Sequence, residues 1–187
     1  TDDILRLPAN GSELRSIRGG DISMIFQEPM TSLNPVLRIS VQMNEVMIRH
    51  LGLSEKEATK KSVEMLEDVG IPDPDKRIYE YPHQFSGGMR QRVMIAIAIA
   101  NNPDLLIADE PTTALDLTIQ SQILKLLKDI QKKLGMSILL ITHDLNIVKH
   151  MAKSVYIMQN ANLVEFGPVK NILFKQKEKE RSRTGQA

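Results

Sequence analysis

The chain has 187 residues, a formal net charge of +1 and no cysteine. This length suffices for one domain with a hydrophobic core, or for one core with a small lobe. The near-zero charge and scarce aromatic residues argue against a nucleic-acid partner, and the lack of cysteine excludes disulfides and thiolate metal sites. The longest unbroken apolar run, Val93 to Ala100, is too short to span a bilayer. We therefore expect any link to a membrane to pass through a partner.

Residues 1–35 are expected to contribute the first part of an α/β core. The segment Ser12 to Arg18 has helical character and is followed by two glycines. The apolar segment Asp21 to Phe26 (DISMIF) predicts a strand, and Gln27 follows at its end. Taken alone, Gln27 is an ordinary loop amide.

Residues 36–100 predict a small helical lobe. Apolar residues at roughly helical spacing predict a helix over Ile39 to Leu51. A second helix is predicted over Ser54 to Val69, because Ser54 and Glu57 match a capping box and a glycine follows the last apolar residue.

The segment Met89 to Ala100 ends in alternating alanine and isoleucine, a pattern that is typical of a strand. The helix propensity of alanine and the stop at Asn101-Asn102-Pro103 favour a buried helix instead. Ser86, Gly87 and Gly88 would open this helix, where backbone N–H groups form a site for an anion. The alternative is that the two glycines only permit a tight turn.

The unbroken apolar run Leu105 to Ala108 is typical of a parallel strand that is covered on both faces. Asp109, Glu110 and Pro111 follow it, so the two carboxylates are expected at the carboxyl edge of the sheet, where open α/β folds bind ligands. One acid there can hold Mg²⁺ and the other can orient or deprotonate a water that attacks a phosphate. The alternative is that both acids merely cap the next helix.

The segment Asp116 to Leu134 predicts an amphipathic helix, with Asp116 as its N-cap and Gly135 at its end. Ser137 to Thr142 (SILLIT) predicts another buried strand. His143 comes directly after it, and a lone histidine in that place is more often structural than catalytic.

The last part of the chain predicts a short helix and a hairpin. Asp144 is expected to cap a helix over Leu145 to Ala152, and Ser154 to Gly167 predicts two antiparallel strands. Residues 175–187 are charged and poor in apolar side chains, so we expect this tail to be disordered.

Two motifs in the middle of the chain carry a resemblance. FSGGMRQR at Phe85 to Arg92, followed by LLIADEPTTALD, resembles the signature motif, Walker B strand and D-loop of ATP-binding cassette (ABC) ATPases. Phe85 and Met89, where most of the superfamily has leucine and glutamine, are similar to the ATPases of oligopeptide, dipeptide and nickel importers. The stretch QEPMTSLNP at Gln27 to Pro35 resembles the same subfamily, and the likeness extends from Ile4 to Phe174.

The resemblance implies a role for each residue at the strand ends. Glu110 would polarise the attacking water, and His143 and Gln27 would position it as switch histidine and Q-loop glutamine. Asp109 would lie on the metal side of the site, and Gln27 would also contact Mg²⁺.

The resemblance also implies a dimer in which two subunits sandwich Mg²⁺–ATP head to tail. Ser86, Gly87 and Gly88 of one subunit would contact the γ-phosphate of ATP held by the other. Asp116 would be the D-loop aspartate at the dimer interface as well as a helix cap.

One part of such a site is missing from the sequence. The P-loop, G-x-x-x-x-G-K-[ST], cradles the β- and γ-phosphates, but none of the ten glycines is followed by lysine. We therefore expect an incomplete P-loop NTPase (RecA-like) core with an inserted helical lobe. Its parts would be residues 1–35 (core with Q-loop), 36–100 (lobe with signature motif), 101–174 (core with Walker B, D-loop and switch histidine) and 175–187 (tail).

The expected function is that of an ATP-binding and ATP-hydrolysing subunit of an ABC importer for peptides or nickel, with ATP and Mg²⁺ as cofactors. Its partners would be a second ATPase subunit and transmembrane permease subunits at the cytoplasmic face of the membrane. The chain alone is expected to be inactive without the P-loop. Two alternatives stay open: a non-hydrolysing fragment or paralogue that supplies the signature motif in trans, and a soluble non-transport ABC ATPase.

Overall fold

A computed structural model of the chain describes residues 3–27, 32–113 and 115–172. The chain divides into two compact units, Thr1–Ile141 and Thr142–Ala187. The predicted division at residues 35, 100 and 174 is finer and stays a prediction. Residues 28–31 of the predicted Q-loop stretch and the predicted charged tail lie outside the described residues.

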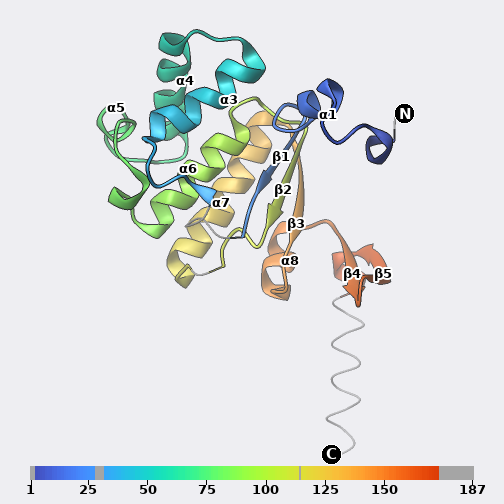
Figure 1. Ribbon diagram of the computed structural model, residues 1–187. Helices are drawn as coiled ribbons and strands as arrows, with labels where there is room; N and C mark the ends of the chain where they lie inside the picture. Colours follow the sequence, from blue (N-terminus) through green and yellow to red (C-terminus); the bar gives the residue numbers. More distant parts are fainter. Residues whose placement is uncertain (1–2, 28–31, 114, 173–187) are drawn as a thin grey trace, which may run out of the picture. The chain divides into compact units, whose positions relative to one another are not determined.

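The first unit is built on a parallel sheet of three strands, in the order β1-β2-β3 (Figure 1). These are β1 (Ile22–Ile25), β2 (Leu105–Asp109) and β3 (Ser137–Ile141). All three strands were expected from their apolar runs. The register pairs Ile25 with Ala108, and Asp109 with Ile141, so the carboxyl ends of the strands meet at one edge.

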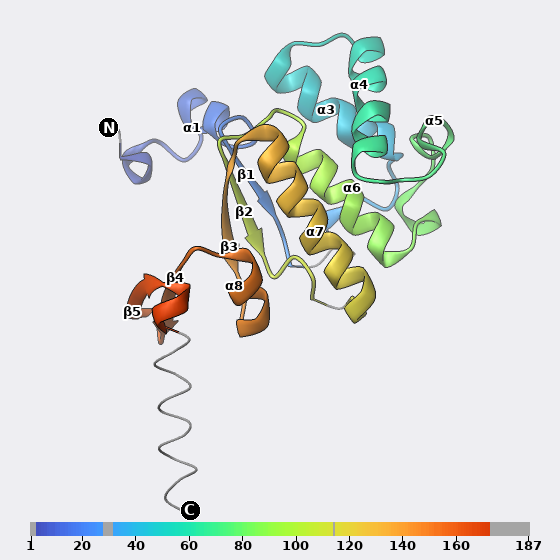
Figure 2. The same cartoon turned by 180° about the vertical axis from the view of Figure 1, so that it is seen from behind.

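Within the described residues of the first unit, the elements that pack on this sheet lie on one of its faces. Ile25 and Leu106 point to the buried face. On the opposite face Met24, Leu139 and Ile141 are 37%, 47% and 45% exposed. The expectation of cover on both faces is therefore wrong for this unit, because α6 and α7 lie along one side of the sheet (Figures 1 and 2).

The helices of the first unit follow the sequence expectations with small shifts of their ends, except for the short helix Pro74–Arg77, which was not predicted. The capping box of the second lobe helix is present, since the Ser54 hydroxyl accepts from the Glu57 backbone N–H at 3.4 Å and the Ser54 N–H donates to Glu57 Oε2 at 2.9 Å. Hydrogen bonding to Ser54 lowers the pKa of Glu57 below its usual value. The helices are α1 (Ser12–Ile17), α3 (Ile39–Leu51), α4 (Glu55–Asp68), α5 (Pro74–Arg77), α6 (Gly87–Ile99) and α7 (Leu117–Leu134), with 3-10 turns at Ile4–Arg6 and Pro82–Gln84.

A buried polar network fixes α3 against α4. The Asn44 amide donates to Thr59 Oγ1 at 2.7 Å, and the Ser62 hydroxyl donates to Asn44 Oδ1 at 2.9 Å. Asn44 and Ser62 are both buried. Since a buried polar group costs free energy unless it is paired, this network favours one register of the two lobe helices.

The alternating segment after the two glycines forms α6, and it is a helix rather than a strand. It is buried on most sides, including Val93, Ile95 and Ala96. Burial all round explains why its sequence has no polar face.

The second unit contains α8 (Leu145–Met151) and a hairpin of β4 (Ser154–Gln159) and β5 (Asn162–Pro168). Both elements were expected. Asn160 and Ala161 form the turn with φ angles of 49° and 59°. Among the residues that the structure describes, no helix combines the length and the apolar composition needed to cross a membrane.

The open face of the sheet predicts that the isolated chain self-associates, because exposed apolar strands invite pairing with another chain. We expect Leu139→Glu to lower the fraction of dimers and larger species, as measured by analytical ultracentrifugation over a concentration series. The matched control is Val41→Glu on α3, since Val41 has the same exposed fraction of 47% as Leu139. An equal decrease in both variants would contradict a specific role of the open face and indicate an effect of net charge.

Candidate functional site

The carboxyl edge of the sheet gathers three of the predicted site residues. Gln27 lies two residues beyond the end of β1, Asp109 is the last residue of β2, and Glu110 follows it. Gln27 is exposed, and the two acids are half-buried. The parallel register thus places one amide and two carboxylates at the same edge, as the sequence predicted.

Glu110 has an unusual backbone conformation. Its φ angle is +46°, in the left-handed region that a residue with a Cβ rarely adopts. Such a conformation costs on the order of 1–3 kcal/mol and persists only where the surroundings enforce it. Here the Glu110 N–H donates to the Ile141 carbonyl at 3.0 Å, so the end of β3 holds the turn.

A threonine that the sequence reasoning did not single out completes this turn. The Thr113 N–H donates to the Glu110 carbonyl at 3.1 Å, and the Thr113 hydroxyl donates to Glu110 Oε2 at 2.8 Å. The only available signal was the position of Thr113 three residues after an acid, which many turns share. The structure identifies Thr113 because both its backbone N–H and its hydroxyl bond to Glu110, the first residue of the turn.

The donor set at this edge suits a hard cation only in part. Carboxylate and amide oxygens are the ligands that Mg²⁺ takes from proteins. Within the described ranges, however, no group of three or more acids, histidines or cysteines is placed to hold a metal ion. Asp109 and Gln27 can therefore supply a minority of the ligands of a magnesium ion, which usually keeps waters and substrate phosphates in its shell.

The signature turn lies at the start of α6. Ser86 is its N-cap, and the Ser86 hydroxyl accepts from the Met89 N–H at 3.3 Å. Ser86 and Gly87 are exposed, so the first N–H groups of the helix are accessible to an anion.

The two glycines of this turn differ in what a side chain would meet. A Cβ at Gly88 would lie 2.9 Å from Ile119 Cγ2, so Gly88 permits the close approach of α6 and α7. A Cβ at Gly87 would meet only Leu115 Cδ2, at an ordinary contact distance of 3.9 Å. Packing within the chain therefore explains the glycine at position 88 but not the glycine at position 87. A ligand that approaches the backbone closely is one possible reason for Gly87.

Asp116 caps α7, as predicted. Asp116 Oδ1 accepts from the backbone N–H groups of Thr118 and Ile119 at 3.0 and 2.9 Å. Ile119 is also the residue beneath Gly88. The aspartate and the signature turn thus meet at one residue of α7, the aspartate at its backbone N–H and Gly88 at its side chain.

Two arginines fix the signature helix, and sequence reasoning had assigned no role to either. Arg90 Nε donates to the Pro82 carbonyl at 2.7 Å. Arg92 donates from Nη1 to the Val69 carbonyl at 2.6 Å and from Nη2 to Gln122 Oε1 at 3.2 Å. Arg92 therefore ties the end of α4 to both α6 and α7.

His143 lies in the second unit, between Thr142 and Asp144, and is exposed. Asp144 caps α8, since its Oδ1 accepts from the Asn146 N–H at 2.7 Å. The predicted placement of His143 beside Glu110 stays a prediction.

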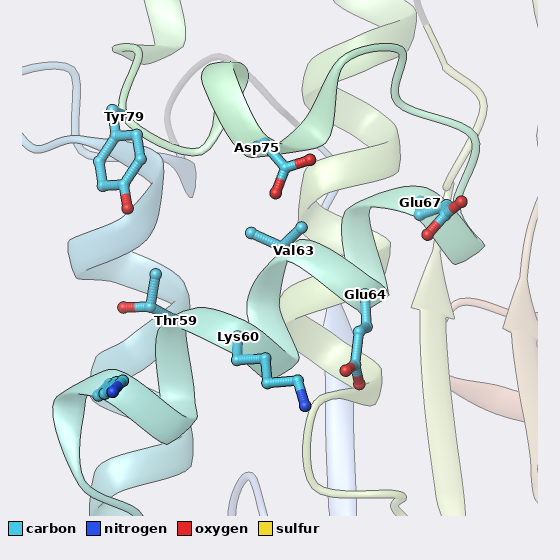
Figure 3. A pocket seen from close by; sticks show the side chains of 8 residues that line it. Thr59, Lys60, Val63, Glu64, Glu67, Asp75 and Tyr79 are labelled. Carbon is cyan, nitrogen blue, oxygen red and sulfur yellow. The ribbon is translucent and has the colours of Figure 1, made fainter.

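A shallow hollow of about 630 Å³ lies on the helical lobe, away from these residues. Figure 3 shows Lys60 and Glu64 of α4 on one side of it, and Asp75 of α5 and Tyr79 on the other. It contains none of the predicted site residues, and its charged side chains point toward solvent, so it does not contribute to the site at the sheet edge.

The chain is similar to ATP-binding proteins of transporters. The family model described as ABC transporter matches residues 5–113. The oligopeptide transport ATP-binding protein OppD of Bacillus subtilis (strain 168) is 54% identical over 168 residues, which cover 90% of this chain and 47% of the relative. The dipeptide transport ATP-binding protein DppD of the same organism is 54% identical over 172 residues, which cover 92% of this chain and 51% of the relative. The chain thus spans about half the length of the curated relatives it matches.

Two solved structures share the fold. The ATP-binding cassette MJ0796, a dimer in a post-hydrolysis state bound to ADP and Pi, superposes with a TM-score of 0.74 at 29% identity over 88% of this chain and 68% of that one. The protein cbiO1 from Clostridium perfringens, part of the ABC transporter complex cbiONQ, has a TM-score of 0.72 at 31% identity over 91% and 64%. These likenesses confirm the predicted α/β fold of a P-loop NTPase core. The chain belongs to the ABC transporter family.

Proposed function

We propose that the chain is part of the ATP-hydrolysing subunit of an ABC importer for peptides. The observation that carries this proposal is the turn after β2, where a strained Glu110 is held at the carboxyl edge of the sheet. Two relatives that are 54% identical to this chain are named as oligopeptide and dipeptide transport ATP-binding proteins. Their names support peptides as the cargo.

In this proposal Glu110 accepts a proton from the water that attacks the terminal phosphate, and Gln27 and His143 orient that water. Bound Mg²⁺–ATP would supply the phosphoanhydride bond that is cleaved. Asp109, at the end of β2, faces the metal side together with Gln27. The half-buried setting of the two acids strengthens their electrostatic effect relative to bulk water.

The second part of the proposal is a partner subunit. Exposed Ser86 and Gly87 at the start of α6 offer a hydroxyl and N–H groups to a phosphate. In the head-to-tail dimer that the resemblance implies, that phosphate would belong to ATP held by a second ATPase subunit. The ATPase subunits would bind transmembrane permease subunits at the cytoplasmic face of the membrane, and the permease would complete the transporter.

A second candidate function is a non-hydrolysing partner that only supplies the signature turn in trans. It is favoured by the exposure of Ser86 and Gly87 at the start of α6, where a phosphate held by another subunit could reach them. It needs Gly87 and α6, but it does not need Glu110. The two candidates therefore differ in which substitution abolishes function.

The first prediction of the proposal concerns Glu110→Gln in the complete gene product. Glutamine has the same shape but cannot take a proton, so ATP binding should persist while kcat for hydrolysis falls by roughly 10²–10⁴-fold. Phosphate release and equilibrium nucleotide binding measure the two effects. Glu67→Gln on the exposed surface of α4 is the control. A Glu110→Gln rate within a few-fold of the unsubstituted protein would exclude Glu110 as the base.

The second prediction concerns the signature turn of the 187-residue chain itself. The chain should bind a hydrolysis-deficient partner ATPase more tightly with ATP than with ADP, because only ATP presents a γ-phosphate. Gly87→Asp should remove this preference, since the fold has room for a Cβ there but the carboxylate would repel the phosphate. Calorimetric titration measures the affinities.

The control for this titration is Ser121→Asp, which adds the same charge on the exposed surface of α7. It should keep the preference for ATP. Equal affinity of the unsubstituted chain with ATP, with ADP and without nucleotide would show that the signature turn does not act in trans.

A further inference from the structure

We infer that Thr113 is a positioning residue, which fixes the direction of the Glu110 carboxylate for its reaction with water. The inference rests on the proposed function and deepens it. Its basis is the hydrogen bond from the Thr113 hydroxyl to Glu110 Oε2, at 2.8 Å in a partly buried setting.

The backbone holds both partners of this bond in place. The Glu110 N–H is tied to the Ile141 carbonyl of β3 at 3.0 Å, and the Thr113 N–H returns to the Glu110 carbonyl at 3.1 Å. With φ at +46°, Glu110 pays a conformational cost that these bonds offset. Both backbone bonds hold the main chain at Glu110 and Thr113. The Thr113 hydroxyl in addition restrains the Glu110 side chain.

The neighbouring threonine shows that this arrangement is specific to Thr113. Thr112 is 5% exposed, and its Oγ1 accepts from Gln120 Nε2 at 3.2 Å. Thr112 therefore fastens the turn to α7, whereas Thr113 is bonded to the carboxylate. The two hydroxyls lie one residue apart in the same turn but have different partners.

A hydroxyl that donates to one carboxylate oxygen sets the direction of the other. Rotation of a carboxylate moves both oxygens together, and a displacement of about 1 Å at a reacting group can cost on the order of 10²-fold in rate. Loss of the Thr113 hydroxyl should therefore lower kcat while leaving nucleotide binding unchanged, since that hydroxyl is bonded to the Glu110 carboxylate.

The experiment compares three variants of the complete gene product, reconstituted with its permease. Thr113→Val removes the hydroxyl at constant shape, Thr113→Ser restores it, and Thr118→Val, on the exposed surface of α7, is the control for the exchange itself. We expect kcat to fall roughly ten- to a hundredfold in Thr113→Val, with the Kd for ATP unchanged within about twofold by equilibrium binding. Thr113→Ser should recover most of the rate, and Thr118→Val should stay within a few-fold of the unsubstituted protein.

A second arm uses the Glu110→Gln background. If Thr113 acts through the carboxylate, Thr113→Val should add little to the loss already caused by Glu110→Gln, because residues that act as one unit are not additive. A merely structural role would lower the rate further by the same factor. Should Thr113→Val fail to fold, as judged by circular dichroism, Thr113→Ala takes its place in both arms.

Each outcome decides the matter. A Thr113→Val rate near that of the unsubstituted protein, no recovery in Thr113→Ser, or an equal loss in Thr118→Val overturns the role of Thr113 and leaves the proposed function intact. An unsubstituted protein that hydrolyses no ATP overturns the proposed function itself, and the role of Thr113 with it.

Discussion

The parallel ladder of β1, β2 and β3 is the constraint on which the site depends. It brings the carboxyl ends of three segments that are far apart in the sequence to one edge. The ladder also reaches one residue past β2, because the Glu110 N–H donates to Ile141. That bond holds the first residue of the following turn in a conformation that its side chain disfavours. Without β3 the two acids would still follow β2, but nothing in the sheet would fix the direction of Glu110.

A second constraint is the close approach of α6 and α7 at Gly88 and Ile119. It explains why one glycine of the signature turn cannot be replaced without moving a neighbour, and it leaves the other glycine to be explained by a ligand. This distinction matters because glycine pairs at helix starts are often read as a single motif. Here packing against Ile119 accounts for Gly88, whereas a Cβ at Gly87 would meet only an ordinary contact.

Much of the fold was predictable because its signals are local. The three strands are apolar runs, and Asp116 and Ser54 are acid or hydroxyl residues at the positions where helices take their caps. The run Leu105 to Ala108 is typical of a strand that is covered on both faces, whereas Met24, Leu139 and Ile141 of the same sheet are exposed in the first unit. Cover depends on which elements pack there, which is a tertiary property.

The candidate site also has features that the sequence predicts and features that it does not. The positions of Asp109 and Glu110 followed from the end of a strand, but the left-handed backbone of Glu110 did not, since glutamate has no preference for it. The bond from Thr113 depends on that conformation and so could not be seen either. Arg92 contacts residues more than twenty positions away on both sides, and no spacing rule pairs them.

The two functional regions are joined by a short covalent path. The turn that begins at Glu110 ends at Asp116, where α7 starts, and Ile119 of α7 lies beneath Gly88. Ile119 donates its backbone N–H to the cap residue Asp116, and its side chain is the atom group that a Cβ at Gly88 would meet. The packing of α6 on α7 and the capping of α7 therefore depend on the same residue, which no pattern in the sequence pairs with Gly88.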